Sequence, residues 1–273
     1  MTPTTITAEL PRTRKPPRML PRLVSAEFLK LRRRRGLVIS MLALTVLPMI
    51  IAYIVLVILH ATEPAKHGPA GGLENFSGSM SLLTQLGVVA AILLGATAGA
   101  GDIRAGVFRE LVVTGRPRLA LFAARVPAGL GLTLAAVCAG FAVTAVASTV
   151  LAGSLAPPGA GLLVESAAWL AIVAGLALVL ALGVSSAVGS RGTALGVVAA
   201  WQLVLMPLLL QIGTLGSLRQ LLPVAATERV APSALFDGGV AVPMSLSVAV
   251  AVIAVWVIMP LAAGAWRTFT RDA

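Results

Sequence analysis

Apolar residues dominate six long blocks of the chain, and short polar segments separate the blocks. Asp, Glu, Lys and Arg are absent from residues 36–62, 75–101, 126–164, 166–190, 192–218 and 238–266. A helix needs about 20 apolar residues to cross a bilayer, so each block can supply one span. We predict an all-α integral membrane protein with six transmembrane helices, at about residues 37–59, 79–100, 127–152, 166–188, 193–213 and 241–264.

The composition agrees with this pattern, and the placement of charge predicts an orientation. Only 11% of the residues are charged, against about 25% in soluble domains. Residues 1–35, 102–125, 190–192 and 267–273, which alternating spans place on one side, hold 18 of the 21 Lys and Arg. Basic residues mark the cytoplasmic side, so we expect both termini, including the tail 267–273, in the cytoplasm. Arg outnumbers Lys 18 to 3, a bias typical of high-GC bacteria, and we expect the bacterial plasma (inner) membrane.

The segment before the first span has two parts. Residues 1–22 are rich in Pro, Thr and Arg and are predicted to be a disordered basic tail. Residues 23–35 form an amphipathic pattern that predicts a short helix beginning near Ser25 and lying on the cytoplasmic membrane surface. The basic run at its end favours membrane lipids over nucleic acid as its partner, because anionic lipid attracts each basic side chain by about 1 kcal/mol. Glu27 can pair with Lys30. We assign to this interfacial helix Glu27, Phe28, Lys30, Leu31 and Arg33.

A second amphipathic segment follows the second span. Residues 102–113 place apolar side chains on one face of a helix, and Gly115 and Pro117 end that helix. A further helical stretch, residues 118–125, leads back to the membrane. The apolar face of 102–113 needs a partner protein or the membrane surface to cover it. The residues that we expect a partner to contact are Asp102, Arg104, Val107, Phe108, Arg109, Glu110 and Leu111.

The predicted spans carry little chemistry. No ionisable side chain lies near the middle of a span, which disfavours an ion-coupled transporter or an intramembrane protease. The two histidines, His60 and His67, lie seven residues apart in the first external loop without the carboxylate geometry of a metal site, so we predict neither a metal site nor a catalytic site. The lone Cys138 excludes a disulfide and is expected to be a small buried residue. The deepest polar groups include Gln85 and Gln202, which either join helices by hydrogen bonds or line a substrate path.

Small residues and prolines shape the predicted bundle. Gly95 and Gly99 have the spacing that lets two helices approach closely, and we expect a helix–helix seam there within the subunit. Residues 215–230 mix leucines with charged residues and predict one or two short helices in the outer leaflet. Three prolines interrupt spans and are expected to kink them: Pro48, Pro207 and Pro260.

Two motifs resemble those of a known family. They are Glu27-Phe-Leu-Lys-Leu-Arg-Arg33 before the first span and the run from Gly106 to Arg118 after the second. In these motifs and in the order of its predicted elements, the chain resembles the permease subunits of type-2 ABC transporters, in particular those of bacterial exporters. The resemblance implies two six-span subunits, the second being another copy or a paralogue, that join two copies of a separate ATPase. The 102–113 helix would then dock on the ATPase as a coupling helix.

The sequence also indicates whether the chain can bind ATP itself. The chain has no Gly-x-x-x-x-Gly-Lys-[Ser/Thr] motif, so it lacks that route to ATP. We expect it to bind no cofactor and to be no enzyme itself, with ATP and Mg held by the partner ATPase. The first hypothesis is an exporter subunit for a lipophilic or amphipathic compound. The alternative is a non-transporting membrane sensor or immunity subunit paired with an ATPase, and an intramembrane enzyme is disfavoured.

Overall fold

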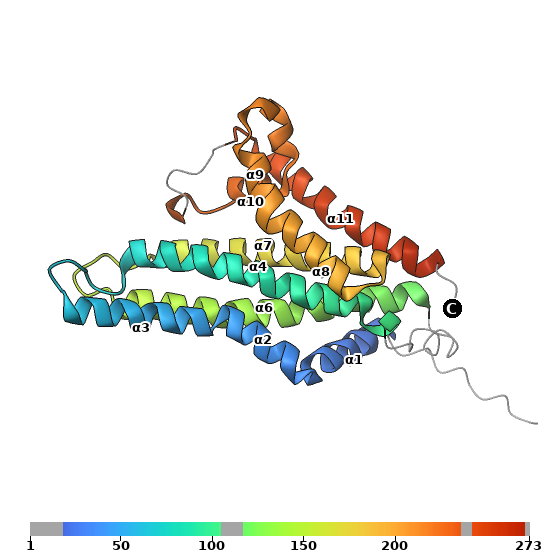
Figure 1. The fold of residues 1–273 in the computed structure, drawn as a ribbon, viewed down its shortest axis with the longest axis horizontal. Coiled ribbons are helices and arrows are strands. Elements are labelled where there is room, and N and C mark those ends of the chain that lie inside the picture. The colour runs from blue at the N-terminus through green and yellow to red at the C-terminus, as the bar shows by residue number, and fades with distance from the viewer. Residues whose placement is uncertain (1–18, 105–116, 236–241, 271–273) are drawn as a thin grey trace, which may run out of the picture.

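The computed structural model describes residues 19–104, 117–235 and 242–270, and within these ranges every regular element is helical. Six helical segments of the described residues are long and apolar enough to cross a membrane: 35–62, 72–101, 118–150, 160–188, 191–211 and 246–270. The predicted all-α fold with six transmembrane helices is therefore confirmed. The elements in chain order (Figure 1) are α1 Met19–Arg33, α2 Arg35–Thr45, α3 Leu47–Thr62, α4 Gly72–Arg104, α6 Arg118–Val150, α7 Ala160–Val188, α8 Arg191–Ala200, a π turn η1 Trp201–Leu205, α9 Met206–Gln211, η2 Gly213–Leu221, α10 Pro223–Arg229, η3 Ser233–Leu235 and α11 Leu246–Thr270.

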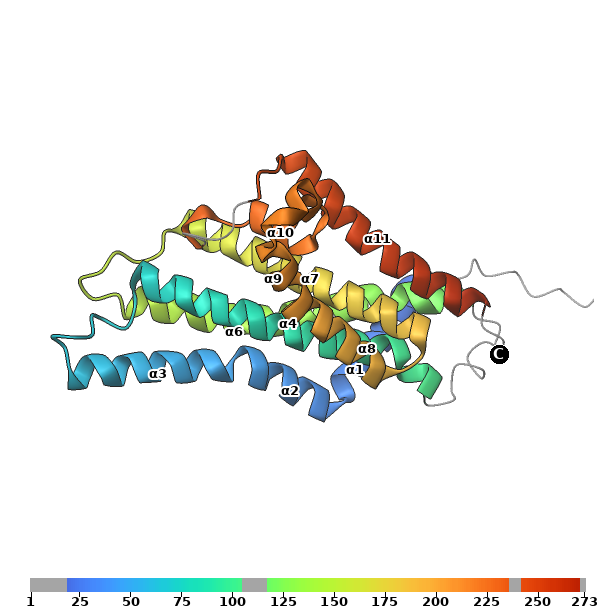
Figure 2. The ribbon, with the colours of Figure 1, turned by 45° about the horizontal axis from the view of Figure 1, so that its top comes forward.

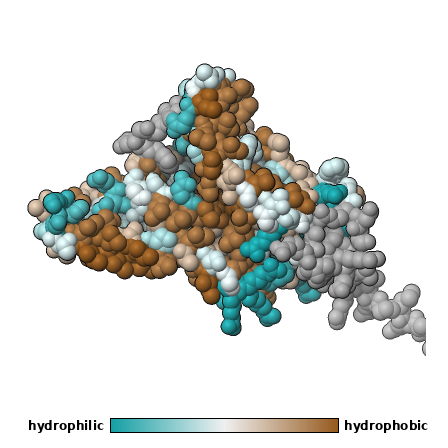
Figure 3. Space-filling model, viewed as in Figure 1, coloured by the Kyte–Doolittle hydropathy of each residue, from teal (hydrophilic) through white to brown (hydrophobic). Residues whose placement is uncertain are grey.

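The two ends of the bundle differ in charge. One end carries α1, the last turn of α4, the starts of α6 and α8 and the end of α11 (Figure 1), and we call it the basic end. Arg32 to Arg35 are exposed there. The opposite, far end carries the loops 63–71 and 151–159. Between them the flanks are mostly apolar (Figure 3), with exposed Ile, Leu and Val side chains on α3 and α11. An apolar flank between two polar ends suits a molecule surrounded by lipid.

Helices α4 and α7 lie at the centre and touch along a seam of small residues. A side chain added at Gly95 would overlap the carbonyl oxygen of Leu178, and one at Gly99 would overlap that of Leu182. The Ser185 hydroxyl donates to the Gly95 carbonyl at 3.3 Å. Close approach of two helices needs residues without bulk at the contact, and the predicted seam at Gly95 and Gly99 is confirmed.

A second seam, between α7 and α11, did not come from the sequence. A Cβ at Gly183 would overlap the Pro260 carbonyl, and Gly264 lies against the same stretch of α7. These contacts sit near the basic end. Toward the far end α11 diverges from α7 (Figure 2), and the short helix α10 contacts both of them, while η2 packs against α10 and α11.

Several predicted boundaries are corrected by the structure. The first helix begins at Met19, so residues 19–22 are not part of a disordered tail, and Ser25 lies inside the helix, where its hydroxyl donates to the Pro21 carbonyl. The extension arises because Leu23 is buried against α6. Cys138 is exposed on the flank of α6 rather than buried. The helical stretch predicted at residues 118–125 is present and continues directly into the span as the first turns of α6.

The three prolines behave differently. The first span breaks at Val46, just before Pro48, into α2 and α3. A π turn at Trp201–Leu205 precedes Pro207. By contrast α11 stays continuous through Pro260. A proline removes one helical hydrogen bond, and only the first two sites coincide with a change in helix type or a break.

Candidate functional site

Gln85 and Gln202, which the sequence suggests as a possible substrate path, line one cavity. The cavity has a volume of about 110 Å³ and lies between α4, α7, the η1–α9 segment and α10. Its polar lining residues are Thr84, Gln85, Gln202, Thr227 and Glu228, and the rest of its wall is apolar. Gln85 is itself exposed, so the cavity reaches the surface of the bundle beside α4. The structure thus brings together two amides from distant spans.

Two tryptophans hold the short helix α10 at the cavity. The indole nitrogen of Trp169, on α7, donates to the Thr227 carbonyl at 2.9 Å. The indole nitrogen of Trp256, on α11, donates to the Leu221 carbonyl at 2.9 Å, just before α10 begins. A seven-residue helix has little stability of its own, so these bonds and its buried Ala225 and Ala226 fix its position. As predicted for residues 215–230, this region forms short helices.

The polar groups of the cavity mostly accept hydrogen bonds. The Thr84 and Thr227 hydroxyls already donate to carbonyls of their own helices, at 2.7 and 2.9 Å, which leaves their oxygens able only to accept. The Gln202 side-chain oxygen is buried and receives no hydrogen bond from the described residues. The carboxylate of Glu228 likewise has no hydrogen bond or ion pair within the described part of the chain, and burial raises its pKa.

Glu228 is the cavity residue that sequence reasoning missed. The sequence places it only within the outer segment 215–230, because the apolar pattern of so short a helix does not show which of its faces is buried. One sign was available in the sequence: the run Pro223-Val-Ala-Ala226 before it is apolar.

The helix α1 packs on α6. Its Leu31 is 1% exposed, and the ring of Phe28 lies over Gly131. The expected pair is present, with the Lys30 ammonium 2.8 Å from a Glu27 carboxylate oxygen. Arg33 is exposed. The apolar face of α1 therefore packs against the transmembrane helix α6, and the basic side chains of α1 point away from α6.

A protein-family model matches most of the chain. The family model described as ABC-2 family transporter protein matches residues 23–206, more than half of the chain. The chain belongs to the ABC-2 transporter family. A comparison with curated proteins gives no match. Together with the six apolar helices, the match makes the chain a multi-pass membrane permease subunit, and it implies pairing with an ABC ATPase. The matched region covers Gln85 and Gln202 and ends before Glu228.

The ATPase-docking segment expected in this ABC-2 permease lies mostly outside the described residues. Helix α4 ends with residues 102–104, which include Asp102 and Arg104, and α6 begins at Arg118. Both ends are at the basic end of the bundle (Figure 1). The remaining expected contact residues, Val107, Phe108, Arg109, Glu110 and Leu111, lie outside the described ranges.

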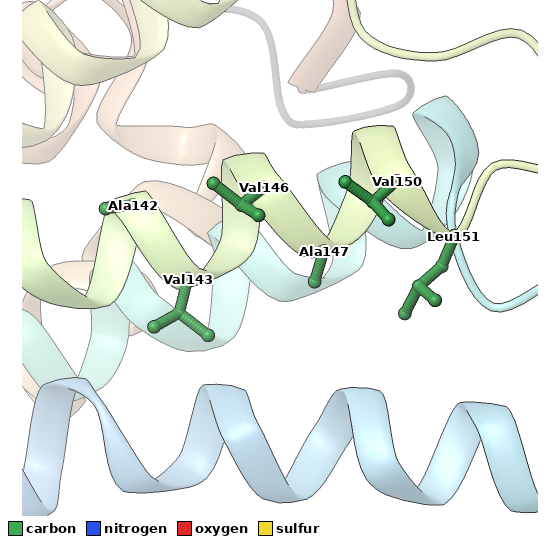
Figure 4. A pocket seen from close by; sticks show the side chains of 6 residues that line it. All are labelled: Ala142, Val143, Val146, Ala147, Val150 and Leu151. Atoms are coloured by element: carbon green, nitrogen blue, oxygen red, sulfur yellow. The ribbon is translucent and has the colours of Figure 1, made fainter.

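The permease also has apolar grooves on its flank. One of about 480 Å³ runs along α6 and is lined by alanine, valine and leucine side chains between Ala142 and Leu151. Of these, Val143, Ala147 and Leu151 point toward α3 (Figure 4). A second groove of about 330 Å³ shares Val143 and Leu151 and adds Tyr53. Surfaces of this kind suit lipid chains, because they lack the polar groups that orient a specific ligand.

One buried charge in the permease was also unexpected. Arg125, on α6, is 1% exposed, and its guanidinium donates to the Gly99 carbonyl at 3.1 Å. The sequence places it just outside a span, because its position next to the apolar block suggests a residue at the membrane surface. The structure instead places it inside the protein near the basic end. Within the described residues no three His, Cys, Asp or Glu side chains are grouped to hold a metal ion.

Proposed function

We propose that this permease exports a lipophilic or amphipathic compound. The observation that carries the proposal is the cavity within the apolar bundle, whose mostly apolar wall includes the polar side chains of Gln85 and Gln202. A binding site for a mostly apolar molecule needs apolar walls with a few polar groups that orient it, and the cavity has this character. An opening beside Gln85 gives such a molecule access from the membrane.

The working assembly is two permease subunits with two ATPase subunits, in the bacterial plasma membrane. The second permease is another copy or a paralogue. ATP and Mg bind to the ATPase, and the permease supplies no catalytic residue. The basic end faces the cytoplasm, since basic residues favour that side. Residues 102–113 dock on the ATPase, which is supported by the amphipathic pattern of that segment and by the position of α4 and α6 at the basic end.

Docking is tested by two substitutions in the 102–113 segment. Phe108→Ala removes an aromatic anchor, which costs about 2 kcal/mol or more in a packed interface. That is roughly a 30-fold weaker affinity for the ATPase. Glu110→Lys reverses a charge and should also weaken co-purification of the ATPase, whereas it would strengthen attraction to anionic lipid.

Glu74→Lys is the matched control, because Glu74 is exposed at the far end of α4. It should leave ATPase binding unchanged. Wild-type affinity in both Phe108→Ala and Glu110→Lys would show that the segment only rests on lipid.

Transport is tested in proteoliposomes that contain the permease and its ATPase. Compounds that stimulate ATP hydrolysis should accumulate in the compartment that the far end faces. Gln202→Leu should reduce stimulation and transport together, and it should fold well because the native amide oxygen is buried without a donor. Gln211→Leu, at an exposed position of α9, is the control. Stimulation without accumulation of any compound would favour the sensor alternative.

A further inference from the structure

The cavity beside α10 has an excess of hydrogen-bond acceptors. Thr84 and Thr227 offer oxygens whose protons are already donated. Gln202 adds a buried amide oxygen without a donor, and Glu228 adds a carboxylate without a partner among the described residues. Of the polar groups that the described residues place in the lining, only the amide nitrogens of Gln85 and Gln202 are free to donate. A buried acceptor without a donor costs about 1–3 kcal/mol, so a group that brings donors is favoured there.

The charges around the cavity also favour a ligand group that carries hydrogen-bond donors. Among the described residues, no Lys or Arg lines the cavity. The guanidinium of Arg229, the neighbour of Glu228 in the chain, donates to the Met244 carbonyl at 2.8 Å. That of Arg219 donates to the carbonyls of Leu210 and Gly216. No Lys or Arg of the described residues therefore pairs with the Glu228 carboxylate. The ammonium group of a ligand would supply a positive charge and two or three N–H donors.

The size of the cavity limits what it holds. About 110 Å³ corresponds to roughly four water molecules at about 30 Å³ each. This volume fits an ammonium group with one or two methylenes and not a whole drug-sized molecule. The remainder of the ligand would leave through the opening at Gln85, where Leu82 is also exposed, and lie along the apolar flank.

We propose that the cavity formed by Thr84, Gln202, Thr227 and Glu228 is a subsite for the ammonium head of a lipophilic primary or secondary amine. The inference rests on the proposed function, and it names the substrate class of the exporter. Glu228 pairs with the charge, and the two threonines and Gln202 accept from the ammonium hydrogens. Trp169 holds Thr227 in place through its indole nitrogen.

A pair of probes that differ only in the head group tests the proposal. Tritiated 4-phenylbutylamine and 4-phenylbutanol are bound to the full-length permease in nanodiscs of zwitterionic lipid, which removes attraction of the amine to anionic lipid. Wild type should bind the amine at least tenfold more tightly than the alcohol. Glu228→Gln should weaken amine binding at least tenfold and leave alcohol binding unchanged. Equal affinity of wild type for the two probes would overturn the proposal.

Two further variants make the result specific. Glu165→Gln removes the same charge from an exposed position on α7, and it should bind the amine as wild type does. Thr84→Val, which removes one acceptor, should weaken amine binding about threefold, and it supplies a test that does not depend on the folding of Glu228→Gln. Wild-type amine affinity in both Glu228→Gln and Thr84→Val would overturn the assignment.

The same samples separate this inference from the proposed function. Phe108→Ala and Glu110→Lys, which address ATPase docking, should leave amine binding intact. Loss of ATPase docking with amine binding retained supports both statements. Amine binding that is absent in a permease that still transports another compound shows that the exporter assignment holds and the amine subsite is wrong.

Discussion

Glu228 is a carboxylate that no basic side chain of the described residues neutralises. It is half-buried, and burial raises its pKa above the ordinary value of 4.5. Removing a charged carboxylate from water without a partner disfavours the charged form, so the folded protein binds a proton at Glu228 more readily than the unfolded chain does. In the absence of ligand the residue therefore opposes folding at neutral pH.

The pH dependence of stability follows from this shift. Because the folded-state pKa is raised, the stability that protonated Glu228 contributes is fully present below about pH 4.5 and is lost as pH rises through the folded pKa. The melting temperature of wild type relative to Glu228→Gln should thus fall between pH 4 and pH 7. Measurement is by thermal unfolding in detergent without amines. A difference that is constant over this range would contradict the shift.

Gly183 is the residue on which the α7–α11 contact depends. Gly183→Ala places a methyl group against the Pro260 carbonyl, and overpacking of this kind costs about 1–3 kcal/mol. Gly196→Ala is the control, because nothing lies within 4 Å of its Cβ position, and alanine favours a helix over glycine by about 1 kcal/mol. We expect the melting temperature to fall for Gly183→Ala and to rise for Gly196→Ala. The same sign for both variants would refute the seam.

The helix α1 has one buried face and one exposed face. Leu31 is 1% exposed, and Leu29, two residues away, is 48% exposed. Leu31→Ala removes a buried side chain at a cost of about 2–5 kcal/mol, so it should loosen α1 from α6 and speed amide hydrogen exchange throughout α1. Leu29→Ala should leave exchange close to wild type. Equal exchange in the two variants would show that α1 is held by the membrane and not by α6.

The sequence predicts long elements well and short ones poorly. The six spans and the Gly95–Gly99 seam follow from apolar length and small-residue spacing, since both are local properties. The start of α1 was placed too late, because Leu23 gains its stability from Leu121 and Ala124, far along the chain. Gln85 and Gln202 were found because they are polar residues within apolar blocks. Glu228 was missed because contacts with distant parts of the chain decide where α10 lies: the bonds from Trp169 and Trp256 and the burial of Ala225 and Ala226.

At the scale of the whole molecule, the orientation in the membrane can be measured directly. In a Cys138→Ala background, cysteines at Thr13 and Thr270 should resist membrane-impermeant reagents in intact cells, and a cysteine at Gly68 should react. The 18-to-3 split of basic residues gives this expectation. Thr270 and Gly68 are exposed at opposite ends of the bundle. Labelling of Thr270 without permeabilisation would reverse the orientation.

The contact between α7 and α11 can also act as a pivot for α11. Gly183 meets α11 at Pro260, which divides that helix unequally. At 1.5 Å per residue, about 15 Å of helix runs from Pro260 to Thr270 and about 21 Å from Pro260 to Leu246. If α11 pivots there as a rigid rod, the contact is a fulcrum. A displacement of its Thr270 end then moves its Leu246 end in the opposite direction by about 1.4 times as much. The longer arm carries Val252 and Ala249, about 12 and 17 Å from Pro260, and both pack in one buried cluster with Ala226 of α10, so a swing of this arm displaces the helix that carries Glu228.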